Sequence, residues 1–156
     1  MEIREAEISD MENICTLSIQ INHQHHMSLP HIFKRPESLE QDAPYWERYL
    51  NDENGIIYVA LKNSQIVGAI CGNVFLNNSM PFLVERLRCC IGTIVVAENH
   101  QRLGLGTLLM KTIENWAKSK GAKTIDLHVM QFNEGAYDLY KKLGYSFLSQ
   151  NMAKEI

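Results

Sequence analysis

One short turn has the residue types of an anion-binding site: Gln101-Arg102-Leu103-Gly104-Leu105-Gly106. It follows a β-rich run and opens a segment whose apolar residues recur at helical spacing. The first N–H groups of a helix have no partner inside the helix, and the helix dipole adds partial positive charge there. Glycines let an anion approach the backbone. The turn therefore predicts an anion site, with a simple chain reversal as the alternative.

Two well-known phosphate-binding loops do not match this turn. A dinucleotide-binding fingerprint would need glycine at position 109, where the chain has Leu109. A P-loop would need a Lys-Ser/Thr pair, which the turn lacks. The turn therefore indicates an anion site without naming its ligand.

Three histidines, His25, His26 and His31, invite a metal-site interpretation. Adjacent histidines rarely aim at one ion, and no carboxylate or cysteine has matching spacing. The cysteines, Cys15, Cys71, Cys89 and Cys90, show no C-x-x-C spacing. Cys89 and Cys90 lie in an apolar run, so buried, reduced thiols are their better interpretation. We therefore predict no bound metal and no disulfide framework.

Length and charge narrow the class of protein. The 156 residues suit a single domain over 1–156 that buries its own core. A formal net charge of −3 argues against nucleic-acid binding, which needs a basic face. Because no basic-then-apolar leader and no apolar stretch of ~18 residues are present, we expect a cytoplasmic protein without membrane contact.

Alternating periodicities predict the elements that position these residues. Strands are expected at 2–7, 56–61, 65–76, 84–97 and 124–130, with one or two more at 145–148 and near 152. Helices are expected at about 10–21, 37–51, 105–120 and 136–143. The nearly continuous apolar run before the glycine turn is typical of a central strand covered on both faces. This order predicts an α/β domain with a mixed sheet.

With these elements in place, the chain resembles the GNAT superfamily of N-acetyltransferases. That family carries Q/R-x-x-G-x-G/A at a strand-to-helix turn, and residues 101–106 match every fixed position. It also carries asparagine, then alanine and tyrosine three and seven residues later, then a lysine-rich turn and Gly-aromatic. The matching residues are Asn133, Ala136, Tyr140, Lys141, Lys142, Gly144 and Tyr145. The resemblance covers residues 66–148 well and the earlier part more loosely.

The resemblance implies a GNAT-like fold, a mostly antiparallel twisted sheet of six to seven strands with about four helices. It implies acetyl-CoA as cosubstrate, beside the absence of a metal predicted above from the ligand spacing. Backbone N–H groups of the turn would hold the pyrophosphate, which adds Thr107 to Gln101, Arg102, Leu103, Gly104, Leu105 and Gly106. Ile94 and Val96 would bind the pantetheine arm through their backbone, and Val96 would polarise the thioester carbonyl. Asn133 and Ala136 would lie beside that arm.

The chemistry needs a neutral amine and a proton for the departing thiol. By resemblance, Tyr140 is the candidate acid, with a core aromatic as the alternative. His128 stands where some relatives supply an acid or base, with a hydrogen-bonded core histidine as the alternative. A lysine-like amine is neutral in roughly 1 of 2,500 molecules at pH 7, which costs about 4.6 kcal/mol, whereas an α-amine costs only ~1 kcal/mol.

The acceptor is left open by the motifs. In relatives, the region between the first two helices lines the acceptor pocket, so the resemblance implies that His25, His26 and Phe33 help choose the amine. We expect acetyl transfer to a small-molecule primary amine through a ternary complex, in a monomer or homodimer. The alternatives are a protein N-terminus or lysine as acceptor, or a non-catalytic acyl-CoA sensor.

Overall fold

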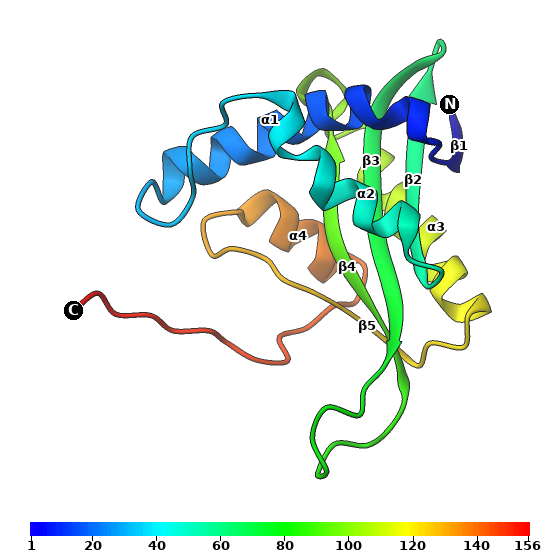
Figure 1. Cartoon of the computed structure of the whole chain (residues 1–156), viewed down its shortest axis with the longest axis vertical. Helices are drawn as coiled ribbons and strands as arrows, with labels where there is room; N and C mark the ends of the chain where they lie inside the picture. The colour runs from blue at the N-terminus through cyan, green and yellow to red at the C-terminus, as the bar shows by residue number, and fades with distance from the viewer.

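A computed structural model describes all residues, 1–156, and its centre is one five-stranded sheet (Figure 1). The strands lie in the order β1-β2-β3-β4-β5, antiparallel throughout except for the parallel pair β4 and β5. Their bounds are β1 Glu2–Glu5, β2 Gly55–Lys62, β3 Gln65–Leu76, β4 Leu87–Val96 and β5 Thr124–Leu127. Because β3 and β4 are the long strands, they form the backbone of the sheet on which the site is built.

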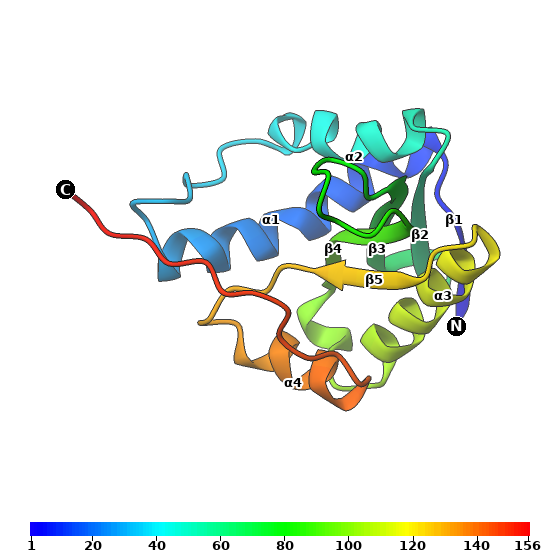
Figure 2. The ribbon, with the colours of Figure 1, turned by 90° about the horizontal axis from the view of Figure 1, so that it is seen from below.

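Helices cover the sheet on both faces (Figure 2). Their bounds are α1 Met11–Ser28, α2 Ala43–Asn51, α3 Leu105–Ser119 and α4 Glu134–Lys142, with short 3-10 turns at Ile8–Asp10, Leu39–Gln41 and Glu98–His100. One buried cluster joins α1 and α2 to the sheet and includes Ile14 and Trp46. A second joins α3 and α4 to the opposite face and includes Leu109 and Tyr140. The sheet therefore separates two chemically distinct sides, called here the α1/α2 face and the α3/α4 face.

A β-bulge interrupts β4 in its middle. Gly72 pairs with Ile91 and Cys71 pairs with Thr93, so Gly92 is the extra residue on the bulged strand. Gly92 is exposed, while its neighbour Ile91 is buried. Such a bulge bends a strand and leaves one residue unpaired. The bend turns the second half of β4 away from β5.

Pairing between β4 and β5 stops at that point. The pairing runs from Arg88–Thr124 to Ile91–Leu127 and goes no further. Beyond Ile91, β4 continues to Val96 with β3 on one side only. The two strands therefore diverge like the arms of a V, and one edge of β4 is open over residues 92–96.

The strand count differs from the prediction of six to seven. No strand follows β5: the predicted strands at 145–148 and near 152 are wrong. The last residues instead leave the sheet as an extended tail (Figure 1) in which Phe147, Leu148 and Met152 are exposed. The apolar spacing suggested strands, but a strand forms only when it pairs with a neighbour. These residues do not pair with the outer edge of β5, so that edge stays unpaired.

Two other boundaries also differ. The first helix continues to Ser28 and so includes His25 and His26, which the sequence placed after it. The expected helix at 37–51 is divided into a 3-10 turn, Leu39–Gln41, and α2, which has Pro44 in its first turn. Proline favours the start of a helix because its missing N–H is not needed there. No helix in the chain combines the length and apolar character needed to cross a bilayer.

Candidate active site

The glycine turn presents a row of unpartnered backbone donors. The N–H groups of residues 102–107 donate no hydrogen bond within the protein, and the first bond of the following helix runs from Leu108 N to Gly104 O at 3.1 Å. Arg102 and Gly104 have positive φ values of 61° and 82°. This left-handed geometry turns successive N–H groups to one side, which is how backbone concavities for anions form. The turn therefore has the free backbone donors that the predicted anion site requires.

The two glycines of the turn have different roles. A Cβ at Gly104 would meet nothing within 4 Å, so its role is conformational and the space beside it is open. A Cβ at Gly106 would lie 3.1 Å from Leu139 Cδ2, which is tighter than ordinary contact. Gly106 therefore lets α3 and α4 approach each other. The close approach keeps the turn and α4 on one side of the molecule.

Side chains of the turn contact the protein as well. Gln101 Nε2 donates to the carbonyl of Val96 at 3.1 Å, which ties the turn to the end of β4. Leu105 is buried in the core and Leu103 is exposed. A Cβ at Gly135 would lie 3.4 Å from Arg102 Nη2, so that guanidinium lies at the first turn of α4. Leu105 can therefore serve an anion only through its backbone.

The open edge of β4 leads toward this turn. The N–H of Ala97 donates to Val67 O on β3 at 2.9 Å. Because bonding direction alternates along an antiparallel strand, the N–H groups of Ile94 and Val96 point to the opposite, open side. An extended ligand lying in the V between β4 and β5 would meet both. This is the geometry that the predicted backbone role of Ile94 and Val96 requires.

Tyr140 lies on the α3/α4 face with its ring in the core. Only 7% of the residue is exposed, and burial raises the pKa of its phenol to about 12. The hydroxyl makes no hydrogen bond, yet it is absent from the buried polar atoms that lack a partner. Its oxygen therefore reaches solvent while the ring is held. A phenol so placed stays protonated at neutral pH and can donate a hydrogen bond to a ligand.

Asn133 and Ala136 meet at the start of α4. Asn133 Oδ1 accepts from the N–H of Ala136 at 3.2 Å, which makes Asn133 the N-cap of the helix. The capping interpretation of Asn133 is thus confirmed, and its Nδ2 is free of protein partners. Ala136 is half-buried beside the α3/α4 core. Its small side chain leaves space on the helix surface next to Tyr140, which lies one turn further along α4.

His128 follows the end of β5 and is exposed. It makes no hydrogen bond within the protein, so the interpretation as a hydrogen-bonded core histidine is wrong. Ile125 and Leu127 pack on the α3/α4 face, and strand alternation puts Asp126 on the α1/α2 face. Continuing that alternation puts His128 on the same side as Asp126, at the mouth of the V.

A polar cluster that the sequence did not reveal lies on the α1/α2 face over the bulge. The hydroxyl of Tyr45 is 2.7 Å from Thr93 Oγ1, and Arg48 Nη2 donates to the Tyr49 hydroxyl at 2.7 Å. A Cβ at Gly92 would lie 2.0 Å from that hydroxyl. Burial raises the pKa of both phenols. The one available signal was the spacing of Tyr45 and Tyr49, which puts them on one helix face.

The predicted acceptor residues gather at the end of α1. His25 makes edge-on contacts with Phe33, at 4.8 Å between ring centroids, and with Phe132, at 5.2 Å. His26 Nδ1 lies 2.9 Å from the carbonyl oxygen of Phe33. Phe132 belongs to the loop before α4, so these contacts join α1 to the loop beyond β5. The residues therefore form a rim between the two loops, and Phe132 is a member that the sequence did not indicate.

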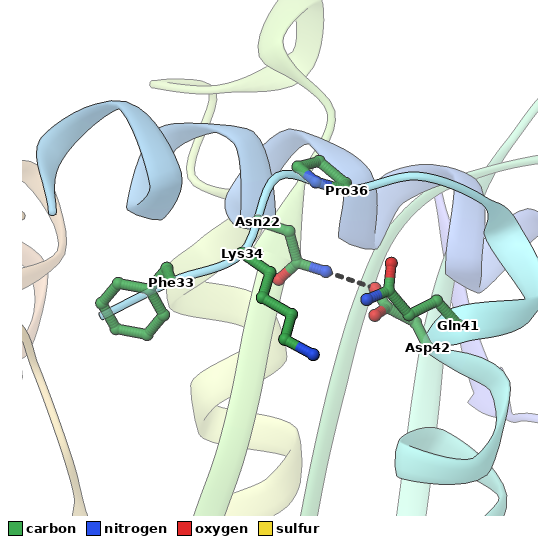
Figure 3. A pocket seen from close by; sticks show the side chains of 6 residues that line it. All are labelled: Asn22, Phe33, Lys34, Pro36, Gln41 and Asp42. Atoms are coloured by element: carbon green, nitrogen blue, oxygen red, sulfur yellow. Dashed lines mark hydrogen bonds between the residues drawn. The ribbon is translucent and has the colours of Figure 1, made fainter. Parts of the chain in front are cut away.

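A solvent-open hollow of about 170 Å³ lies next to this rim (Figure 3). It is lined by Asn22, Phe33, Lys34, Pro36, Gln41 and Asp42. The Asp42 carboxylate accepts from Asn22 and from Ser18 Oγ, and Ser18 in turn accepts from the buried Trp46 indole at 3.3 Å. These bonds hold α1 against the start of α2. The hollow therefore has a structural explanation in addition to any ligand role.

No group of three or more histidine, cysteine, aspartate or glutamate side chains is arranged to hold a metal ion. His25 Nδ1 lies 2.8 Å from Ile21 O, and His26 Nδ1 is engaged by Phe33 O. His31 lies near Glu155 instead, with 3.7 Å between Nε2 and Oε1. The three histidines therefore point to three different partners. All four cysteines are free thiols.

Comparison with known proteins agrees with this geometry. Residues 23–145 match the family described as the acetyltransferase (GNAT) family. An N-alpha-acetyltransferase of Sulfurisphaera tokodaii is 29% identical over 150 residues, covering 92% of this chain and 78% of that protein. An uncharacterized N-acetyltransferase of Bacillus subtilis, YobR, is 41% identical over 61 residues, which cover 39% of this chain and only 25% of that protein.

Among solved structures, a tetramutant of the BH1408 protein from Bacillus halodurans superposes with a TM-score of 0.93 over the whole of both chains, at 24% identity. At that identity the likeness establishes the fold.

Proposed function

Because the chain belongs to the GNAT family of acetyltransferases, we propose that it transfers the acetyl group of acetyl-CoA to a primary amine of a small molecule. The observation that carries the proposal is the row of unpartnered N–H groups at residues 102–107, beside an open strand edge. A turn of this kind suits a pyrophosphate, and an open edge suits the amide-bearing pantetheine arm. One ligand that needs both is coenzyme A.

The residues present fit that ligand. The turn would hold the pyrophosphate, Ile94 and Val96 would bond the arm through their backbone, and the free Asn133 amide would reach the same arm. Acetyl-CoA supplies an activated thioester when bound. The N–H of Val96, aimed into the V, is placed to polarise a carbonyl there.

We assign the acceptor amine and the leaving thiol to opposite faces of the sheet. Tyr140 belongs to the α3/α4 face, and the cluster over Gly92 belongs to the α1/α2 face. A direct reaction in a ternary complex would bring the amine from the α1/α2 face and release the thiol on the side of Tyr140. The Tyr140 hydroxyl would then donate a proton to the departing thiolate.

His128 is the proposed base. It is exposed at the mouth of the V, where a side chain could accept a proton from the incoming amine directly or through water. A neutral imidazole has a free ring nitrogen that can accept such a proton. The acceptor's own pKa decides how much this matters, because an α-amine is already largely available at pH 7.

A second candidate is transfer to the N-terminus of a protein. The similarity to the N-alpha-acetyltransferase of Sulfurisphaera tokodaii favours it, because that match covers most of both chains. A protein N-terminus is also an α-amine, the kind that costs least to deprotonate. The two candidates share the cofactor site and differ only in what enters from the α1/α2 face.

The deciding experiment is a screen for release of free coenzyme A from acetyl-CoA in the presence of single acceptors. The panel should hold small amines, amino acids and short peptides with free or blocked N-termini. We expect release with small primary amines. Release with peptides alone would favour the second candidate. Tight acetyl-CoA binding without release from any acceptor would favour a non-catalytic sensor.

Three further features belong to this proposal. The chain would act as one domain over residues 1–156, as a monomer or homodimer. It would need no metal and would bind neither nucleic acid nor membrane. The cytoplasm is the proposed location, and the four free thiols are typical of a reducing compartment.

A further inference from the structure

Arg48 is a cation held rigidly at the acceptor side of the site. Its guanidinium carbon lies 4.5 Å from the centroid of the Tyr45 ring and 4.7 Å from that of Tyr49. It also donates to the Tyr49 hydroxyl at 2.7 Å. Two aromatic faces and a hydrogen bond fix a side chain that is otherwise among the most flexible. A guanidinium fixed in this way is pre-organised for a partner.

That partner is not supplied by the protein. The ion pairs in the structure are Arg4–Asp10, His31–Glu155 and Arg88–Asp126, and none involves Arg48. Arg48 is exposed, so the side of the guanidinium that does not contact the rings faces solvent. The rest of its donor fork is therefore available to a ligand.

The neighbouring charges leave the α1/α2 face positive at this point. Asp126 is a carboxylate on the same face, and Arg88 holds it with bonds of 2.6 and 3.0 Å. That pair cancels its own charge. Arg48 is left as the uncompensated charge beside the bulge, which favours an anion and disfavours a second cation.

Arg48 is also close to where the reaction would occur. Its partner, the Tyr49 hydroxyl, lies directly above Gly92, and Gly92 is two residues from Ile94 on the open edge of β4. Two residues of extended strand span about 7 Å. The Tyr49 hydroxyl that Arg48 contacts therefore lies near the start of the open edge, which suits a small acceptor that reaches both.

We propose that Arg48 selects the acceptor by binding its carboxylate, so that the substrate is a small amine that carries a carboxylate a few atoms from its amino group. The assignment rests on the proposed acetyl transfer and names the class of acceptor for it. Guanidinium and carboxylate match in geometry and can form paired hydrogen bonds. Tyr45 and Tyr49 position Arg48 and so act through it.

The test compares matched acceptors in the coenzyme A release assay. Each amino acid or short amino-carboxylic acid is paired with its carboxamide, which keeps the amine and removes the negative charge. Wild-type protein should favour the acids in kcat/KM. Arg48→Gln should raise KM for the acids about 10- to 100-fold and change KM for the amides and for acetyl-CoA little.

Arg86→Gln is the matched control, since it removes the same charge from an exposed position in the loop before β4. Arg48→Lys should recover part of the preference, because it restores charge without the fork. A second readout is calorimetric binding of the acids to protein saturated with coenzyme A, which should weaken in Arg48→Gln.

The outcomes distinguish the role of Arg48 from the proposed acetyl transfer on which it rests. Equal turnover of acids and amides, unaffected by Arg48→Gln, would overturn the role of Arg48 and leave acetyl transfer standing. A preference for peptides with acidic side chains over small acids would overturn the small-molecule class. Failure of the acids to bind or turn over, while their carboxamides are acetylated, would overturn the assignment alone, and absence of turnover with every amine would overturn the proposed function with it.

Discussion

The hydroxyl of Tyr49 lies directly above Gly92, so close that a Cβ at position 92 would be 2.0 Å from the hydroxyl oxygen. The missing side chain at the β4 bulge is what lets α2 approach the sheet there, with Arg48 bonded to the Tyr49 hydroxyl. Overpacking a well-packed contact costs typically 1–3 kcal/mol. The position of Tyr49, and with it that of Arg48, therefore depends on the absence of a side chain at the bulge.

Gly92→Ala should destabilise the protein by about 1–3 kcal/mol, because the new methyl group forces Tyr49 and α2 outward. It should also weaken any acceptor preference that depends on Arg48. The measurement is denaturant unfolding beside acceptor kinetics.

Gly135→Ala is the matched control for Gly92→Ala. Its Cβ would meet only Arg102 Nη2, at an ordinary 3.4 Å, and alanine favours a helix by roughly 0.5–1 kcal/mol. We expect it to be neutral or stabilising. Equal melting behaviour of the two variants would show that the Tyr49–Gly92 contact does not limit the packing of α2.

Gly104→Asp should weaken acetyl-CoA binding at least tenfold by calorimetry. Position 104 has a positive φ of 82° and open space around it, so an added carboxylate would lie beside the proposed phosphate site. Gly104→Asn has the same shape without the charge, and asparagine tolerates this backbone region. If the two variants bind acetyl-CoA equally, then the pyrophosphate lies elsewhere.

Tyr140→Phe should lower kcat about 10- to 1000-fold, a barrier increase of roughly 1.4–4 kcal/mol, and change KM for acetyl-CoA little. The hydroxyl has no protein partner, so its loss should shift stability by less than ~1 kcal/mol. Steady-state kinetics beside a melting curve measure both. A mutant with wild-type kcat would leave Tyr140 as a core residue and water as the proton donor.

Stability should decline in alkaline solution. Burial raises the pKa of Cys71 and of Tyr140 to about 12, from ordinary values of 9.0 and 10.0. Between those values the unfolded chain loses protons that the folded protein keeps, so the free energy of unfolding falls as pH rises. We expect it to be level below about pH 8 and then to fall by roughly 1 kcal/mol per pH unit for each group.

Urea unfolding at stepped pH measures this decline. Tyr140→Phe should make it shallower above about pH 10, since one of the contributing groups is removed. A decline that is equally steep in the mutant would mean that Tyr140 titrates alike in the folded and unfolded states.

Activity should survive removal of metal ions. His25 and His26 both direct Nδ1 to backbone carbonyl oxygens, and His31 lies near Glu155. Dialysis against a chelator, followed by elemental analysis and the coenzyme A release assay, tests this. Activity that disappears with the chelator and returns with zinc would contradict the prediction.

Local rules were enough to predict the geometry of the glycine turn and of the start of α4. The turn at 101–106 is determined by glycines and by the start of a helix, and both are properties of adjacent residues. Asn133 as an N-cap is local for the same reason. The bounds of β2 and β3 follow from strand periodicity, and the structure places them within a residue or two of the prediction.

Where pairing decides, the sequence was less informative. The apolar residues of 145–152 have the composition of strands, but no neighbouring strand pairs with them. In the same way, the bulge at Gly92 exists because β3 and β4 are one residue out of step, which no single segment can show. The early end of β5 at Leu127 follows from that bend.

The sequence by itself determined the family, the glycine turn and the helix that carries Tyr140, because each depends on residues close together in the chain. Only the tertiary structure showed which side chains meet on the other face of the sheet, over the β4 bulge. Arg48 stacks on Tyr45 and Tyr49 within α2, which is a local contact, but only the fold sets that group over Gly92, more than 40 positions away. Contacts between distant segments depend on how the sheet bends and which charges are already paired, and neither is encoded in local spacing.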